Sequence, residues 1–83
     1  MSLQMVFLFD LFPNPSSSHL EFFSPAKAEA EVINSSGEIV QRFSCSQGST
    51  KVSIENLPIG IYFLRLLTAE ANSSATFIRI DNP

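Results

Sequence analysis

The feature that most constrains how this 83-residue chain can fold is the segment Leu57-Pro58-Ile59-Gly60-Ile61-Tyr62-Phe63-Leu64. A leucine and a proline precede a glycine, and a tyrosine then opens an apolar run. This order predicts a corner between two strands of a β-sandwich. At such a corner the tyrosine ring packs in the core and its hydroxyl bonds to main chain upstream. The segment predicts an all-β module and no particular reaction.

Turn signals recur about every eight to twelve residues, which is the spacing expected of a sandwich. Between them the pattern predicts seven strands, at Val6–Phe12, His19–Phe23, Ala26–Ile33, Glu38–Ser44, Thr50–Glu55, from the corner to Thr68, and at Ala75–Ile80. The predicted turns include Ser46–Ser49 and Ala71–Ser74. The fold class that follows is an all-β, immunoglobulin-like or fibronectin-like antiparallel β-sandwich of about seven strands.

The segment Ala26–Ile33 alternates in the manner of a strand with one buried and one solvated face. Its pattern predicts Ala26, Ala28, Ala30 and Val32 on the buried face, and Lys27, Glu29 and Glu31 on the face that meets water. The loop Asn34-Ser35-Ser36-Gly37 follows, where Gly37 can adopt the left-handed conformation that short hairpin loops need.

Two of the predicted strands, Val6–Phe9 and Ile61–Leu67, are apolar on both faces. In a two-layer sandwich one face of each strand normally meets water. Two interpretations stay open. Loops or the end of the chain cover these outer faces, or Ile61, Phe63 and Leu67 form an exposed apolar stripe for a partner or a neighbouring domain.

The composition indicates one small domain, residues 1–83, in which we interpret residues 1–4 as cloning or linker residues. The N-terminus lacks the basic start and the small-residue cleavage site of a signal peptide. A net charge of −3 with five Lys and Arg argues against a nucleic-acid partner. His19 and Cys45 are the only histidine and cysteine, so a metal ligand set and an internal disulfide are both excluded. We therefore expect no metal, no cofactor and no enzymatic activity.

Four segments in order carry a resemblance to a known family: Leu11-Phe12-Pro13-Asn14-Pro15, Val32–Val40, Leu57–Leu64 and Phe77-Ile78-Arg79-Ile80. The chain resembles the type A C-terminal sorting domain of the type IX secretion system, or Por secretion system, of Bacteroidetes. These domains show an aromatic-Pro-Asn-Pro opening, a glycine hairpin, a Leu-Pro-x-Gly-x-Tyr corner and a basic residue near the end. The resemblance covers about Leu11 to Ile80.

The resemblance implies that the domain acts as a secretion signal and not as an enzyme. Such a domain follows a cargo domain and directs it from the periplasm across the outer membrane, to the cell surface or the medium. A sortase-like peptidase then cleaves it, and the cargo is released or anchored to surface lipopolysaccharide. The implied motif residues, structural or recognised by the machinery, are Pro13, Asn14, Pro15, Gly37, Leu57, Pro58, Gly60, Tyr62 and Arg79. Recognition is expected at the last strand, including Arg79.

The chain departs from the family pattern in having Arg79 where lysine is usual, and the family pattern leads us to expect a cargo domain before these 83 residues. A rival interpretation is a fibronectin-like adhesive or carbohydrate-binding accessory module of a surface protein, and a third is a plain spacer domain. Sugar binding favours exposed tryptophan or tyrosine. This chain has no tryptophan, and its single tyrosine is predicted to lie in the core.

Overall fold

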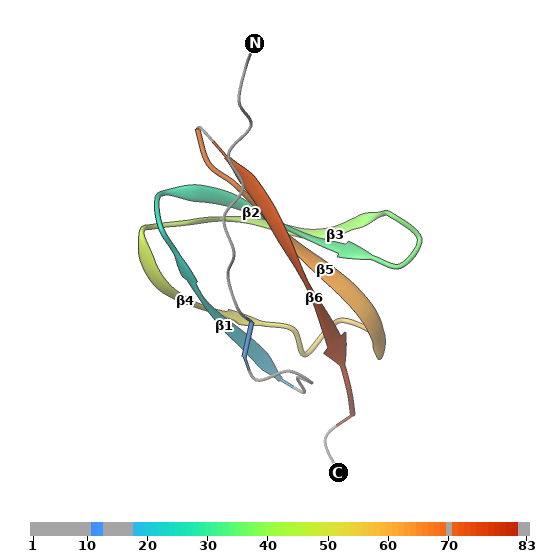
Figure 1. The fold of residues 1–83 in the computed structure, drawn as a ribbon. Helices are drawn as coiled ribbons and strands as arrows, with labels where there is room; N and C mark the ends of the chain where they lie inside the picture. The colour runs from blue at the N-terminus through green and yellow to red at the C-terminus, as the bar shows by residue number, and fades with distance from the viewer. Residues whose placement is uncertain (1–10, 13–17, 70, 82–83) are drawn as a thin grey trace.

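The computed structural model describes residues 11–12, 18–69 and 71–81. This part of the chain forms six strands: β1 (His19–Ser24), β2 (Ala28–Asn34), β3 (Ile39–Cys45), β4 (Gly48–Ser53), β5 (Gly60–Leu67) and β6 (Asn72–Arg79). The strands are arranged in two antiparallel sheets, β1-β4 and β3-β2-β5-β6, in a sandwich-like arrangement (Figure 1). The predicted all-β fold class is confirmed, and its immunoglobulin-like subdivision stays a prediction. No helix that could span a membrane occurs among the described residues.

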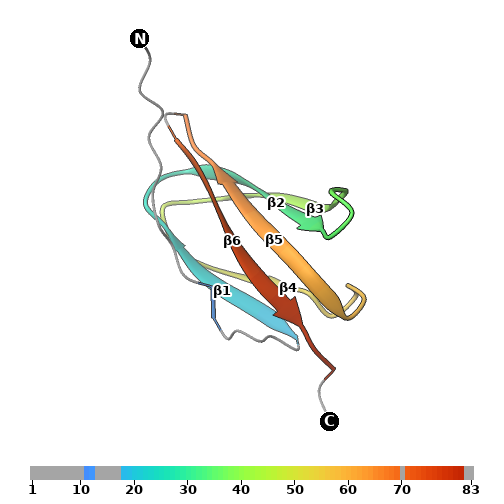
Figure 2. The same ribbon diagram turned by 45° about the vertical axis from the view of Figure 1, so that its right-hand side comes forward.

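The core lies between the two sheets, which face one another in both ribbon views (Figure 2). In strands whose side chains alternate between buried and exposed, every second side chain lies in this core. The fully buried apolar members, with 0 % exposure, are Leu20, Phe22, Ala30, Val32, Ile54, Leu64, Leu66 and Phe77. Burying each large side chain contributes about 1.5–3 kcal/mol. Phe22 of β1 and Phe43 of β3 meet across the layers, with ring centroids 6.3 Å apart.

The strand predicted at Val6–Phe12 lies outside the described residues except for its last two positions. Leu11 is buried, and Phe12 forms an antiparallel bridge with Glu21 of β1. The two main-chain hydrogen bonds of this bridge measure 3.1 and 2.7 Å. Chain upstream of β1 therefore reaches the two-stranded sheet at Phe12.

Two predicted turns are wrong in extent. The turn assigned to Ala71–Ser74 closes earlier, because the Thr68 N–H and hydroxyl both donate to the Ala71 carbonyl, at 2.8 and 3.1 Å. Asn72, Ser73 and Ser74 then pair with β5 as the start of β6. These residue types favour turns locally, but a partner strand overrides that preference. The loop predicted at Ser46–Ser49 is likewise shorter, since β4 begins at Gly48.

The burial prediction for Ala26–Ile33 is correct for Ala28, Ala30 and Val32, which are all buried. It is wrong for Ala26, which is exposed and precedes β2. It is also wrong for Glu31, which is only 7 % exposed although it lies on the outer face.

Candidate functional site

The predicted corner is present at the entry to β5. Tyr62 is 4 % exposed, and its hydroxyl donates to the Pro58 carbonyl oxygen over 2.6 Å. Its ring stacks on Phe77 of the neighbouring strand, with centroids 5.5 Å apart and an interplanar angle of 18°. The hydroxyl thus bonds to main chain upstream, as the sequence predicts. Tyr62 fixes where the chain turns into the four-stranded sheet.

The crossover, residues 54–59, joins β4 of one sheet to β5 of the other. Its first half is anchored by Ile54 and Leu57, which are 0 % and 8 % exposed. The Leu57 N–H donates to the Ile54 carbonyl oxygen at 3.1 Å. Tyr62 holds the second half of the crossover through Pro58. A segment that connects two layers therefore has a fixed path.

Arg79, at the end of β6, also binds the crossover. Its Nε donates to the Ile54 carbonyl oxygen at 3.0 Å and its Nη2 to that of Glu55 at 3.2 Å. Its Nη1 donates to the Ile80 carbonyl oxygen. The guanidinium therefore clamps the end of the last strand onto the connection between the sheets. The resemblance implied that this basic residue is recognised by the secretion system; the contacts give it a structural role first.

The motif residues of the sequence converge at one end of the four-stranded sheet. The register pairs Asn34 with Tyr62, and Gly60 with Arg79. The β2–β3 loop, the corner and the end of β6 therefore share this end. The motif residues placed here are Gly37, Leu57, Pro58, Gly60, Tyr62 and Arg79. Pro13, Asn14 and Pro15 lie outside the described residues.

Gly37 has φ +88°, in the left-handed region that glycine adopts without strain. Asn34 closes the loop around it, because its Oδ1 accepts hydrogen bonds from the N–H groups of Ser36 (3.0 Å) and Glu38 (2.9 Å). The predicted hairpin loop and its glycine are confirmed in their geometry.

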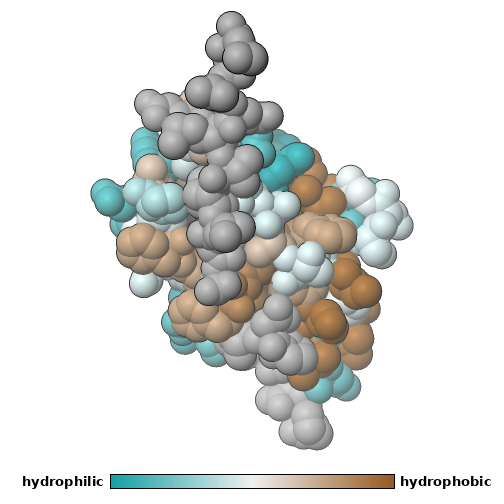
Figure 3. All heavy atoms as spheres, in the orientation of Figure 1, coloured by the Kyte–Doolittle hydropathy of each residue, from teal (hydrophilic) through white to brown (hydrophobic). Residues whose placement is uncertain are grey.

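An apolar patch covers the outer face of the four-stranded sheet at this same end. The outer-face patch consists of Ile33, Ile39, Ile61, Phe63 and Ile78, of which all but the half-buried Ile33 are 38–51 % exposed. The register sets Ile39, Ile33 and Phe63 opposite one another on three strands, and Ile61 opposite Ile78. Figure 3 shows hydrophobic residues gathered between the β2–β3 loop and the end of β6.

The exposed fractions along β5 bear on the two interpretations of its doubly apolar pattern. Ile61 and Phe63 are 51 % and 38 % exposed, so the outer face of β5 is not fully covered. Leu67 is half-buried and is separated from Phe63 by Arg65, so it is not part of the patch. The sequence did not indicate Ile33, Ile39 and Ile78 as part of the patch, because they join it only through the strands that lie beside β5 and β2 in the sheet.

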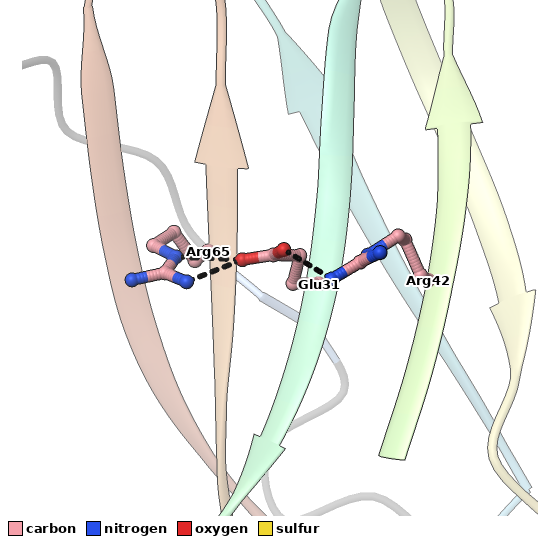
Figure 4. Close-up of polar contacts among 3 residues, drawn as sticks. All are labelled: Glu31, Arg42 and Arg65. Atoms are coloured by element: carbon pink, nitrogen blue, oxygen red, sulfur yellow. Dashed lines mark hydrogen bonds and ion pairs between the residues drawn. The ribbon is translucent and has the colours of Figure 1, made fainter. Parts of the chain in front are cut away.

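A row of three charged side chains, drawn in Figure 4, lies next to the patch on the same face of the sheet. Glu31 of β2 lies between Arg42 of β3 and Arg65 of β5, its partners in the register. Arg65 Nε donates to Glu31 Oε1 at 2.8 Å, and Arg42 Nη2 lies 3.2 Å from Oε2. The two arginine side chains cover the carboxylate, which is why Glu31 is nearly buried on the outer face.

The hydrogen bond from Arg65 is the main cause that lowers the pKa of the Glu31 carboxyl below its ordinary value. Charge attraction from Arg65 and Arg42 acts in the same direction, against desolvation. Glu31 is therefore ionised at neutral pH and is shared by two guanidinium groups. These three side chains together have a net charge of +1.

Among the described residues we find no cluster of metal-ligating side chains and no exposed thiol. They contain no group of three or more His, Cys, Asp or Glu that could hold a metal ion. Cys45 is a buried free thiol, and burial raises its pKa, which disfavours the reactive thiolate. A shallow hollow at the opposite end of the sheet is bordered by Lys27, Glu29 and Thr68. At the end of the four-stranded sheet where the motif residues lie, the domain exposes the outer-face patch.

Two antiparallel sheets, a corner fixed by Tyr62 and an apolar patch on the outer face characterise this all-β module. The model of one protein family, described as "Secretion system C-terminal sorting domain", matches residues 10–80 of the chain. The chain therefore belongs to this family, the C-terminal sorting domains of type IX secretion, as the resemblance in its sequence indicated. No curated protein and no solved structure matches the chain.

Proposed function

We propose that this domain is the sorting signal that directs an attached N-terminal cargo protein from the periplasm across the outer membrane through the type IX secretion machinery. Membership of the family supports a sorting signal for type IX secretion, with export toward the cell surface or the extracellular space. In the proposed pathway a sortase-like peptidase then removes the domain, and the cargo is released or anchored at the surface.

The observation that carries this proposal is the family match over residues 10–80. The convergence of the motif residues at one end of the sheet supports it. A corner fixed by Tyr62 and a last strand clamped by Arg79 give the machinery a surface of constant shape. The rival, a carbohydrate-binding module, lacks a comparable support, because the single tyrosine is 4 % exposed and stacked on Phe77.

The test is fusion of the chain to the C-terminus of a periplasmic reporter in a bacterium that has a type IX system. We expect the reporter in the medium or on the surface, and the domain removed. The matched control is the same fusion in a strain whose type IX system is deleted, where the reporter stays periplasmic with the domain intact. A reporter that stays periplasmic in both strains would refute the sorting role. Export without trimming would refute the peptidase step alone.

A further inference from the structure

We propose that the outer-face patch is a docking surface for a protein partner that presents an apolar surface bordered by a carboxylate. The proposal rests on the proposed function, in which that partner belongs to the export machinery. It commits to a protein whose contact with the domain is transient, as opposed to a second copy of this chain or a membrane.

The first support is the way in which the patch is built. Its five side chains come from four strands and are set opposite one another by the register of a single sheet. The opposite faces of the same strands hold buried core residues, including Val32, Leu64 and Phe77. The patch is therefore preformed on a rigid layer, and a partner does not have to order it.

The second support is its size. Five large apolar side chains that are on average less than half exposed present on the order of 300 Å², the size of the largest apolar patch on a typical monomer, which is often functional. A stable protein–protein interface buries about 800 Å² on each partner. A dimer through this patch alone would fall well short of that area. The size fits a contact that forms and is released, as export of a cargo requires.

The third support is the charge along its border. The patch contains no charged side chain, and the adjoining row Arg42–Glu31–Arg65 has a net charge of +1, with the carboxylates of Glu29 and Glu38 at nearby positions of the same hairpin. Peripheral membrane surfaces use clusters of about four to eight Lys or Arg, so one excess charge is far too little for an anionic membrane. One carboxylate on a protein partner would balance the row.

The experiment replaces Ile61 and Ile78, which face each other, by threonine. Threonine is β-branched and suits a strand, so Ile61→Thr/Ile78→Thr removes apolar surface while preserving the sheet. The matched control is Phe23→Thr, because Phe23 is an apolar side chain that is 57 % exposed on β1, in the other sheet. Both variants are measured in the full chain fused to the exported reporter.

We expect the control to export the reporter as the unmodified domain does, and the double variant to reduce export at least tenfold. In the double variant the fusion is expected to accumulate in the periplasm with the domain protease-resistant. Normal export by the double variant would overturn the docking proposal while the sorting role stands. Failure of the unmodified domain to export would instead overturn the proposed function. If the double variant loses its protease resistance, Phe63→Thr is tested in its place, with the same two outcomes.

Two further measurements distinguish a protein partner on the patch from a second copy of this chain and from a membrane. The unmodified chain is examined by sedimentation at increasing concentration, and by flotation with vesicles of phosphatidylethanolamine and phosphatidylglycerol. We expect a monomer that does not float. A dimer that the double variant abolishes would assign the patch to a second copy, and vesicle binding that it abolishes would assign it to a membrane. Either result overturns the proposal.

Discussion

Removing one oxygen atom, with Tyr62→Phe, tests whether the corner contributes to stability as the geometry indicates. The tyrosine hydroxyl donates to the Pro58 carbonyl oxygen over 2.6 Å, and the ring stacks on Phe77. Phenylalanine keeps the ring and its packing and loses only the donor. The free energy of unfolding should therefore report the hydrogen bond alone.

The expected loss of stability is about 1 kcal/mol, the net value of a typical hydrogen bond. The larger penalty of a buried, unpaired acceptor is not expected, because Pro58 is an exposed residue. For a chain of this size the loss corresponds to a melting temperature lower by about 4–8 °C. With a urea dependence of about 1 kcal/mol per molar, the midpoint falls by about 1 M.

Urea unfolding followed by far-ultraviolet circular dichroism is the suitable assay. Fluorescence is not, because the substitution removes the only tyrosine and the chain has no tryptophan. Ser36→Ala is the control, since it deletes a hydroxyl at an exposed loop position and should change stability by less than about 0.5 kcal/mol. Equal midpoints for Tyr62→Phe and the unmodified chain would refute the assigned role of the hydroxyl. A loss above about 3 kcal/mol would show that the ring itself had moved.

Three further predictions concern other contacts of the fold. Arg79→Met should lower the free energy of unfolding by about 2 kcal/mol, and Arg79→Lys by less, because a lysine donates to fewer of the three carbonyls; a methionine variant as stable as the unmodified chain would rule out the clamp. Gly37→Ala should cost about 1 kcal/mol in the same assay. The cause is backbone strain at φ +88°, since an added Cβ would meet no atom within 4 Å, and an unchanged midpoint would contradict it. Because the pKa of Glu31 is lowered by folding, its ionised form stabilises the protein above the ordinary pKa of 4.5, and this stabilisation is lost as the pH falls through the lower folded value. The stability advantage over Glu31→Gln, measured by urea unfolding from pH 7 to pH 3, should therefore be constant at neutral pH and shrink below about pH 4.5.

The local parts of the fold could be predicted from the sequence. The strands, the Gly37 loop and the corner each depend on periodicity or turn chemistry within a few residues, and this information is in the chain itself. The turn at Ala71–Ser74 failed for the opposite reason. Asn72, Ser73 and Ser74 have turn-forming side chains, but their pairing with Leu67, Leu66 and Arg65 of β5 extends the strand. That pairing depends on two segments together, so it cannot be predicted from the residues of either segment alone.

The outer face illustrates the same limit. Alternation places Glu31 away from the core, and it does lie on the outer face, but alternation cannot show that β2 lies between β3 and β5. Only that strand order sets an arginine on each side of the carboxylate. In the same way, the doubly apolar pattern of β5 pointed to Ile61 and Phe63. The other three members of the patch follow from which strands are neighbours.

Arg79 is where the resemblance and the geometry favour different roles. A basic residue near the end of the chain invites the interpretation that its charge is recognised. The guanidinium instead donates to the carbonyl oxygens of Ile54, Glu55 and Ile80, so its donors are engaged within the domain. A residue used in this way affects a partner by holding β6 against the crossover. Arg79 directly follows Ile78, which pairs with Ile61 in the patch, so we expect loss of the clamp to loosen this part of the patch. Arg79→Lys keeps the charge, so export that falls in both Arg79→Lys and Arg79→Met in proportion to their loss of stability would reflect a displaced surface and not a missing charge.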